Sequence, residues 1–267
     1  VSGTIGLALS VIYRLASCGA KVVFGARRET VGQMAEERLR EMGFDARFCQ
    51  LDVSSVESCQ QIVAFAEQTY GTVDIVIPVA AAFFARAFVD VKESEYDRIV
   101  DVNQKGQYFL VQAAVRSMIR GKRGGKVVTV ASVAYRGEDM PKLAMMTPYN
   151  TAKAGVVGMT RGIAKELKQY GINVTCVAPG GMVTPGALAN NRTTAELYGP
   201  EWVRYVRQYG SSVPVAHNPD EVARMILTLC TPVSDFMYGQ TVEVDGGSQF
   251  SFPDKPWSYT MEGGLHA

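Results

Sequence analysis

The chain has 267 residues, of which 47% are hydrophobic and 20% are charged, and its formal net charge is +1. This length and composition predict one globular α/β domain, 1–267, with a single hydrophobic core. Because the sequence has neither a basic run nor an apolar stretch long enough to cross a bilayer, we expect no nucleic-acid partner and no membrane span.

Cysteine and histidine usage predicts no metal site. The cysteines lie apart in apolar segments, without the paired spacing of zinc ligands, so we expect buried free thiols and a reducing, cytoplasmic location. His217 and His266 lie far from any cysteine or carboxylate cluster, which leaves a histidine-based triad or metal centre without partners. The five cysteines are Cys18, Cys49, Cys59, Cys176 and Cys230.

The first thirty residues predict a glycine-bearing loop, an amphipathic helix and a strand over 21–25. Gly3 and Gly6 precede the helix, where a glycine loop lets backbone N–H groups and the helix dipole approach a pyrophosphate. An ordinary surface loop is the alternative. In a doubly wound fold this loop follows the first strand. No strand precedes Val1, so we expect a truncated first strand and a gap of about 10 Å between its neighbours.

Two arginines follow the strand over 21–25. They stand where dinucleotide-binding folds contact the adenosine ribose. An acidic residue there would bind a 2′-hydroxyl, whereas Arg27, followed by Arg28, suits a 2′-phosphate and favours NADP(H) over NAD(H). A solvated arginine pair at a helix start is the alternative.

Helices and strands alternate through the middle of the chain, which predicts a parallel sheet. Asp52, just past a strand, either accepts a hydrogen bond from an adenine amino group or caps the next helix. The small residues over 78–82 suit a chain that runs close to a flat ligand. Asn103 lies amid apolar helix residues and is expected to bend the helix, either to face the site or as a structural polar residue. The expected elements are helices over 29–42 and 55–70, strands over 45–51 and 73–77, and one or two helices over 93–121.

The segment 131–155 carries a serine, a tyrosine and a lysine that could meet at one carbonyl. Ser132 ends an apolar strand over 126–131, at the edge of the sheet where α/β sites form. Tyr149 and Lys153 stand four residues apart, which places both side chains on one helix face. An ammonium near a phenol lowers its pKa. A tyrosine and lysine at this spacing also arise by chance, but the order and the strand-then-helix context favour a functional set.

The last third of the chain predicts a strand over 172–177, a Pro/Gly turn over 178–185 and a segment rich in aromatic residues. Trp202, Tyr205 and Tyr209 recur on one helical face, either as core or as part of a substrate lid over 186–217. The apolar tail, 248–267, is expected to pack on this subunit or on a neighbour. A helix over 219–230, with Asn218 as its N-cap and Pro219 at N1, and a strand over 240–244 complete the elements.

With these motifs in place, the chain resembles the short-chain dehydrogenase/reductase family over essentially its whole length. The resemblance implies a single-domain doubly wound Rossmann fold, in which helices flank a parallel sheet. It also implies an oxidoreductase that interconverts a ketone and a secondary alcohol with NAD(P), and a homo-oligomer, either a tetramer or a dimer. The matching segments are 102–106, 131–132, 149–153, 179–180 with Thr184, and 244–247.

The resemblance assigns a role to each member of the catalytic set. Ser132 would orient the substrate oxygen, and Tyr149 would be the acid in reduction or the base in oxidation. Lys153 would bind the nicotinamide ribose and lower the pKa of Tyr149, while Asn103 would hold a water that connects the lysine to solvent. The residues that match the family's cofactor contacts are Gly3, Ile5, Gly6, Arg27, Asp52, Val53, Ala80, Asn103, Tyr149, Lys153, Pro179, Gly180, Met182 and Thr184.

Two segments depart from the family pattern. In the segment Gly3-Thr4-Ile5-Gly6, the family's second loop glycine is either shifted by one position or replaced by another residue. This difference puts the cofactor geometry there in doubt. The segment 78–81, Pro-Val-Ala-Ala, stands where the family has Asn-Asn-Ala-Gly. This change removes side-chain hydrogen bonds that usually brace the loop, although the small residues keep clearance for a ring.

The substrate is expected to be a bulky, apolar ketone or alcohol, such as a steroid, polyketide or terpenoid. Met140, Met145 and Met146 are flexible apolar side chains suited to an adaptable surface, and the aromatic segment adds to them. Packing in the core or between subunits is the alternative for these side chains. Two further functions stay open. They are a 3-oxoacyl thioester reductase and a non-catalytic NADP(H)-binding protein, although the complete Asn, Ser, Tyr, Lys set argues against the latter.

Overall fold

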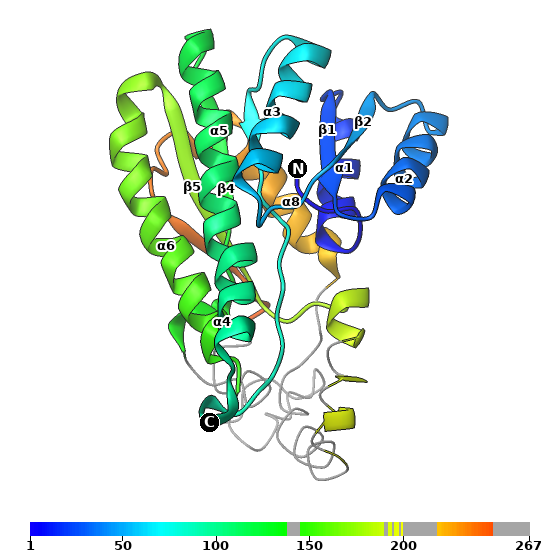
Figure 1. Cartoon of the computed structure of the whole chain (residues 1–267). Helices are drawn as coiled ribbons and strands as arrows, with labels where there is room; N and C mark the ends of the chain where they lie inside the picture. The colour runs from blue at the N-terminus through cyan, green and yellow to red at the C-terminus, as the bar shows by residue number, and fades with distance from the viewer. Residues whose placement is uncertain (138–144, 190–191, 194, 198, 200–217, 248–267) are drawn as a thin grey trace, which may run out of the picture.

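The structure is a computed structural model of the chain. It describes residues 1–137, 145–189, 192–193, 195–197, 199 and 218–247. Helices and strands alternate along the described chain, as the sequence predicts (Figure 1). Trp202, Tyr205, Tyr209 and the tail 248–267 lie outside the described residues, as does most of the lid over 186–217.

The strands form two groups, and every pairing within them is parallel. In the first group, β1 (Val22–Ala26) pairs with β2 (Ala46–Gln50). The second group has the order β3-β4-β5-β6. Its members are β3 (Ile75–Val76), β4 (Gly125–Val130), β5 (Ile172–Pro179) and β6 (Thr241–Val244).

The first three residues lie between the two strand groups. Ser2 forms a parallel bridge with Gly25 of β1, and its N–H donates to the carbonyl of Ile77, just past β3, at 3.3 Å. Gly25 in turn donates to the carbonyl of Val1 at 3.0 Å. Residues 1–3 therefore occupy the carboxyl end of the expected gap between the two neighbouring strands, which corrects the prediction of an open gap there. Through this segment the strands follow the order of a doubly wound sheet.

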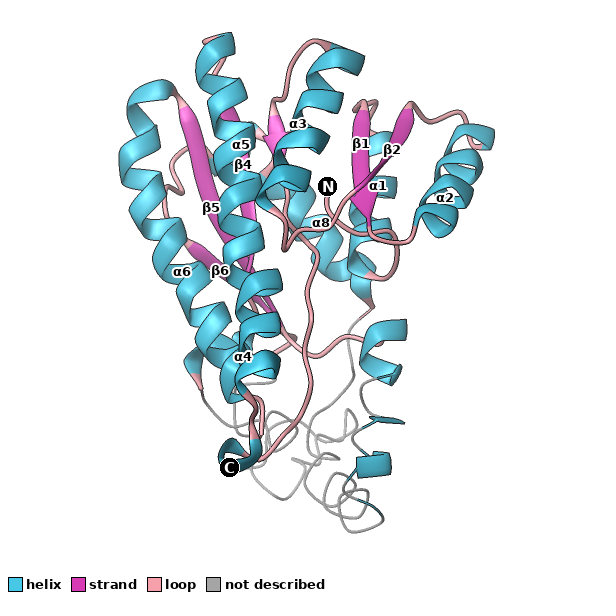
Figure 2. Cartoon of the chain, in the orientation of Figure 1, coloured by secondary structure: helices cyan, strands magenta, loops and turns pink. Residues whose placement is uncertain are grey.

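Helices cover both faces of the sheet (Figure 2). One core cluster joins β4 and β5 to α3, α5 and α6, and a second joins the strands to α1, α2 and α8. All eight residues of β5 are buried, as a central strand covered on both sides requires. The helices are α1 (Leu7–Ser17), α2 (Glu29–Glu41), α3 (Val56–Tyr70), α4 (Glu93–Val100), α5 (Gly106–Gly121), α6 (Thr147–Leu167) and α8 (Pro219–Leu229).

Helix ends follow the local capping signals. Asn218 caps α8 by accepting the N–H of Asp220, with Pro219 in the first turn, as predicted. Ser55, rather than Asp52, caps α3, because its hydroxyl accepts the N–H of Ser58 at 3.2 Å. The prediction that Asp52 caps this helix is therefore wrong.

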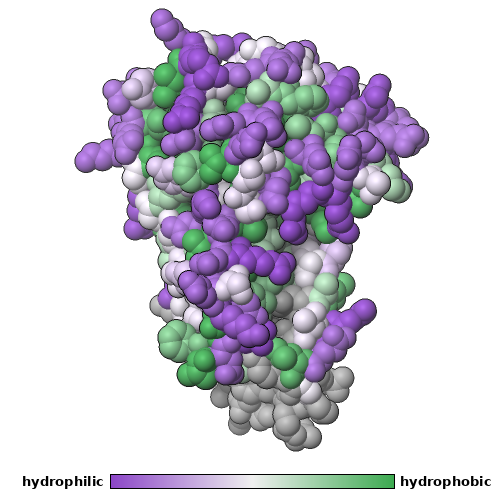
Figure 3. All heavy atoms as spheres, viewed as in Figure 1, coloured by the Kyte–Doolittle hydropathy of each residue, from purple (hydrophilic) through white to green (hydrophobic). Residues whose placement is uncertain are grey.

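None of the helices in the described ranges is both long and apolar enough to cross a bilayer. On the face shown in Figure 3, hydrophobic residues are interspersed in small groups among polar ones. Within the same ranges no three potential ligands gather as a metal site would require.

All five cysteines are free, but only Cys59 and Cys176 are buried. Cys18 is exposed, because it ends α1 on the solvent side. Cys49 and Cys230 are half-buried. The expectation of five buried thiols is therefore wrong for the other three.

Candidate active site

A cavity of about 520 Å³ opens at the carboxyl edge of the sheet, where α/β proteins bind ligands. The loop before α1, the ends of β1, β2, β4 and β5, and the segment 79–83 line it. Of the predicted site residues, all of which the structure describes, only Asn103 lies outside this lining. The residues that line it are Gly3, Ile5, Gly6, Arg27, Asp52, Val53, Ala80, Ser132, Tyr149, Lys153, Pro179, Gly180, Met182 and Thr184.

The start of α1 fits a pyrophosphate. Gly6 is its N-cap with φ +58°, no side chain accepts the first N–H groups, and the first turn holds no acidic residue. Gly3 packs so closely on the helix that a Cβ there would lie 2.6 Å from the Cβ of Ala8. The first N–H groups of a helix lack partners within it and favour an anion. This end of the cavity therefore suits the phosphates of a dinucleotide.

Positive charge and one carboxylate border the cavity beyond β1 and β2. Arg27 and Arg28 are both exposed on its lining. Asp52 accepts hydrogen bonds from the N–H and hydroxyl of Ser54 at 3.0 and 2.6 Å. These bonds, with a smaller contribution from Arg27, lower the pKa of Asp52. The carboxylate is thus charged at neutral pH and lies beside Val53, where an adenine amino group can donate to it.

The opposite wall is formed by the segment after β5. Gly180 approaches Asp245 so closely that a Cβ there would lie 2.8 Å from the Asp245 backbone. Thr184 faces Gly6 across the cavity, because its methyl group would lie 3.2 Å from a Cβ at Gly6. Met182 lines the cavity beside them.

The segment 78–82 is braced, although it lacks the asparagines expected there. The N–H of Ala80 donates to the hydroxyl of Ser2 at 2.8 Å. Asn103 makes two bonds to Ala82, accepting from its N–H at 3.3 Å and donating to its carbonyl at 2.6 Å. The expected loss of bracing is therefore made good by side chains from elsewhere in the chain.

Asn103 lies in a π-helical segment, Asp101–Lys105, between α4 and α5. Such segments interrupt α-helices and often mark functional sites. The side chain is fully buried and donates to the carbonyls of Ile99 and Ala82. Of the two interpretations left open for Asn103, these bonds favour the structural one for its side chain, because the amide is bonded to the loop that borders the cavity.

Ser132, Tyr149 and Lys153 meet at the cavity. Ser132 follows β4 and begins a 3₁₀ turn, where its hydroxyl accepts the N–H of Ala134 at 3.3 Å and donates to the carbonyl of Pro179 at 3.4 Å. Tyr149 and Lys153 lie on α6, with the lysine Nζ 5.5 Å from the centre of the tyrosine ring. The helix spacing thus brings the two side chains together as expected.

Burial dominates the proton equilibria of this pair. It raises the pKa of Tyr149 to about 12, against a smaller lowering by the contact with Ser132. It lowers the pKa of Lys153 to about 8. The expected lowering of the Tyr149 pKa by the lysine is absent. The Lys153 ammonium itself donates to the carbonyl of Val130, at 2.8 Å.

The turn that carries Ser132 is tied to the last strand. The Tyr135 hydroxyl donates to Glu243 of β6 at 2.7 Å, and Arg136 donates to the same carboxylate at 2.6 Å. The Arg136 guanidinium also lies 5.8 Å from the centre of the Tyr135 ring. These contacts hold the carboxyl ends of β4 and β6 together beside Ser132.

Phe83, Arg98 and Val102 are among the cavity-lining residues that the sequence analysis did not single out. The Phe83 ring lies 5.9 Å from the Tyr149 ring, inclined at 60°. Arg98 and Val102 line the cavity from α4 and the π-helical segment. Val102 could have been found from its position next to Asn103. Phe83 and Arg98 carry no local signal, because only the fold brings their elements to this edge.

Two methionines of the segment before α6 are described, and Met140 lies outside the described residues. Met146 is buried, which contradicts its expected place on an adaptable surface. Met145 has φ +70°, and its carbonyl accepts the N–H of Arg86 at 2.7 Å. This contact links the end of the segment 79–86 to the start of α6.

A doubly wound fold with a cavity at the carboxyl edge of its sheet, lined by a Ser, Tyr, Lys set, is typical of an oxidoreductase that uses a nicotinamide cofactor. Comparisons with known proteins agree. A family model described as "Enoyl-(Acyl carrier protein) reductase" matches residues 2–249. The chain belongs to the short-chain dehydrogenase/reductase family. It is an oxidoreductase that acts on CH–OH groups, interconverting alcohols and ketones, and it binds NAD(P).

Similar proteins include both curated relatives and solved structures. Sorbitol dehydrogenase from Cereibacter sphaeroides is 33% identical over 225 residues, which cover 82% of this chain and 85% of that protein. Dehydrogenase/reductase SDR family member 4 from Oryctolagus cuniculus is 31% identical over 249 residues, covering 92% and 91%. A crystal structure of an actinorhodin polyketide ketoreductase with NADPH has a TM-score of 0.84 at 27% identity, covering 93% of this chain and 95% of that one.

Proposed function

We propose that this chain is an NADP(H)-preferring carbonyl reductase or alcohol dehydrogenase that acts on a bulky, apolar ketone or secondary alcohol. The observation that carries the proposal is the meeting of Ser132, Tyr149 and Lys153 at one end of a cavity whose other end holds Arg27. A nicotinamide bound between these ends would supply or accept the hydride.

In reduction, Tyr149 is the acid. Its pKa of about 12 keeps the phenol protonated at neutral pH, so it can donate to the carbonyl oxygen as negative charge develops there. Ser132, held by Pro179 and Ala134, donates to the same oxygen and orients it. In oxidation, Tyr149 takes the proton of the alcohol instead.

Lys153 would hold the ribose hydroxyls of a bound cofactor, and its ammonium, 5.5 Å from the ring centre of Tyr149, would compensate the negative charge left on the phenol after proton transfer. Asn103 contributes by fixing the segment 80–82, which borders the same space. We place the water relay that the family resemblance implies at the backbone of the π-helical segment, since the Asn103 amide is already bonded.

The preference for NADP(H) rests on charge at the end of β1. Arg27 and Arg28 are exposed and line the cavity, and the segment 26–28 holds no acidic residue that would accept from a 2′-hydroxyl. A guanidinium pairs well with a phosphate, because it offers several donors in one plane.

The argument for a bulky, apolar substrate comes from the cavity wall beside Tyr149. Phe83, whose ring centre lies 5.9 Å from that of Tyr149, gives this wall an apolar character. The polyketide ketoreductase neighbour acts, by its name, on such a substrate, whereas sorbitol dehydrogenase acts on a polyol. A 3-oxoacyl thioester is the alternative substrate. We further propose a cytoplasmic homo-oligomer, a tetramer or dimer, on the family resemblance.

The test follows NADPH oxidation, at the nicotinamide absorbance, with a steroid ketone, an aromatic bicyclic ketone, acetoacetyl thioester and fructose, beside NADH controls. We expect turnover with at least one bulky ketone. Turnover of fructose alone would contradict the apolar substrate. Tight NADPH binding without turnover of any ketone would favour the non-catalytic alternative.

Tyr149→Phe separates the acid from the binding site. We expect turnover to fall by about three orders of magnitude, because the phenol is the proton donor, while NADPH affinity changes by less than about threefold. Tyr170→Phe is the matched control, since Tyr170 is exposed at the opposite end of the strands. A Tyr149→Phe enzyme with a near-normal rate would remove the assignment.

A further inference from the structure

Gln107, in the first turn of α5, is a buried polar residue that the proposed mechanism does not use. It is 2% exposed, and both ends of its amide bond to one residue of β4. Nε2 donates to the carbonyl of Val130 at 2.8 Å, and Oε1 accepts the N–H of Val130 at 3.2 Å. A buried amide is tolerated only when its hydrogen bonds are made, and here they are.

The sheet explains why Val130 needs this partner. The next residue, Ala131, donates to Val177 of β5, so the N–H and carbonyl of Val130 point the other way, toward β3. The pairing of β3 with β4 ends at Val127. Gln107 therefore occupies the place where a longer β3 would have bonded Val130.

The same carbonyl is also the anchor of Lys153. The lysine Nζ donates to the Val130 oxygen at 2.8 Å, as does the amide of Gln107. Both side chains are buried, and they come from different helices, α6 and α5. One strand-end carbonyl thus joins Gln107 to the lysine at the cavity.

We propose that Gln107 is a positioning residue for Lys153, because it fixes the Val130 carbonyl that holds the lysine ammonium at one place in the cavity. This inference rests on the proposed function, in which Lys153 binds the cofactor ribose and supports Tyr149. Gln107 itself does not line the cavity, so its effect passes through Val130.

Gln107 also bears on the charge of Lys153. Two donors share one oxygen, so the positive end of the Gln107 amide lies near the ammonium and opposes its charge. The other groups that face the ammonium are Tyr149 on its own helix and Cys176 on β5. Both are neutral at neutral pH, because burial raises the pKa of each. Removing the Gln107 amide should therefore raise the pKa of Lys153 from about 8.

The test compares Gln107→Leu with the wild type, using the ketone of the panel that the wild type reduces fastest. Gln107→Leu keeps the volume but loses both hydrogen bonds. We expect kcat to fall by about tenfold, with KM changed by less than about twofold, because the ammonium is less well placed while the substrate wall is intact. In the pH profile of kcat/KM for ketone reduction, the loss of activity on the alkaline side (the alkaline limb) should move to higher pH.

Gln107→Glu is the second variant. It keeps an acceptor for the Val130 N–H and places a carboxylate near the ammonium. We expect the alkaline limb to move further up in this variant than in Gln107→Leu. If Gln107→Leu does not fold, Gln107→Glu carries the same test.

The pH dependence of NADPH binding, followed by nicotinamide fluorescence, is a readout that does not need turnover. Loss of binding at alkaline pH should move upward in both variants, in step with the kinetic limb.

Asn173→Leu is the matched control. Asn173 is also a buried amide whose two ends bond one residue, Ser234, but it lies at the amino end of β5, away from the cavity. We expect this variant to be less stable, with an unchanged alkaline limb. If the alkaline limb of a Gln107 variant lies at the same pH as that of Asn173→Leu, Gln107 only satisfies the backbone groups of Val130, and the inference is overturned. A wild type that turns over no ketone would instead contradict the proposed function, and the binding profile would still decide the inference.

Discussion

At the scale of single residues, the buried ammonium of Lys153 lowers the free energy of unfolding at neutral pH. Its side chain is 1% exposed, and burial lowers its pKa from 10.5 to about 8. At neutral pH the folded protein therefore holds a desolvated ammonium that the unfolded chain keeps in water. Between pH 8 and 10.5 the unfolded chain binds more protons, so the free energy of unfolding rises with pH in this window.

We predict that Lys153→Met abolishes turnover and raises the melting temperature at neutral pH, because the desolvation cost is removed while the apolar stem is kept. The difference from the wild type should shrink as the pH rises from about 8 to 10.5, where the wild-type lysine is already neutral. Thermal unfolding across this range measures it. Lys165→Met, on the exposed face of α6, is the control and should show no such trend. A Lys153→Met protein less stable than the wild type at neutral pH would contradict the argument.

Arg27 decides cofactor preference in the proposed function. We predict that Arg27→Ala lowers the affinity for NADPH by about tenfold and the affinity for NADH by less than about twofold, because only NADPH carries the 2′-phosphate. Fluorescence titration with both cofactors measures the two losses. Arg38→Ala, further along α2, should change neither. Equal losses for both cofactors at Arg27 would remove the phosphate assignment.

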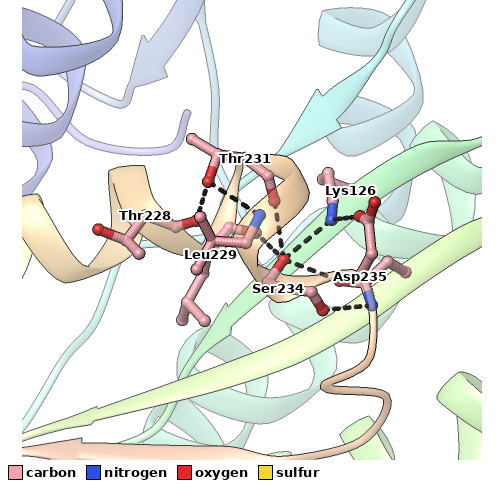
Figure 4. Close-up of polar contacts among 8 residues, drawn as sticks. Lys126, Thr228, Leu229, Thr231, Ser234 and Asp235 are labelled. Atoms are coloured by element: carbon pink, nitrogen blue, oxygen red, sulfur yellow. Dashed lines mark hydrogen bonds and ion pairs between the residues drawn. The ribbon is translucent and has the colours of Figure 1, made fainter.

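At the scale of elements, the turn between α8 and β6 is fastened to the amino end of β4. Figure 4 shows Lys126 of β4 reaching Ser234 and Asp235, at 2.9 and 2.5 Å. The buried hydroxyl of Ser234 also donates to the carbonyl of Leu229, at 2.7 Å, which closes the end of α8. This network lies at the opposite end of the strands from the cavity and so belongs to the fold.

We predict that Lys126→Met lowers the free energy of unfolding by about 1–2 kcal/mol, since a half-buried ion pair and a hydrogen bond are lost. Urea denaturation measures the loss, and NADPH affinity should be unchanged. Arg40→Met removes an exposed pair with Glu36 and should cost less than about 0.5 kcal/mol. Similar losses in the two variants would mean that the network contributes no more than a surface pair.

At the scale of the whole molecule, the cavity crosses the junction between the two strand groups. Arg27 and Asp52 belong to the β1–β2 side, whereas Ser132 and Thr184 belong to the β3–β6 side. Apart from helix packing, the described backbone links across this junction run through residues 1–3. A bound dinucleotide would therefore hold the two sides together.

We predict that NADPH at about 100 times its dissociation constant stabilises the protein by about 2.7 kcal/mol, or roughly 5 °C in melting temperature. NADH at the same concentration should give a smaller shift. Tyr149→Phe should keep the full NADPH shift, because its binding residues are intact. Loss of that shift in Tyr149→Phe would show that the phenol is needed for binding rather than for proton transfer.

The sequence by itself determined the alternation of helices and strands, most element ends to within one or two residues, and the pairing of Tyr149 with Lys153. These depend on local periodicity, capping residues and helical spacing, which a single segment carries. Only the tertiary structure decided where Asn103 points, how residues 1–3 fill the junction, which way burial moves the Tyr149 pKa, and that Gln107 and Lys153 share one carbonyl. Each of these depends on contacts between segments far apart in the chain, and such contacts leave no mark on local spacing.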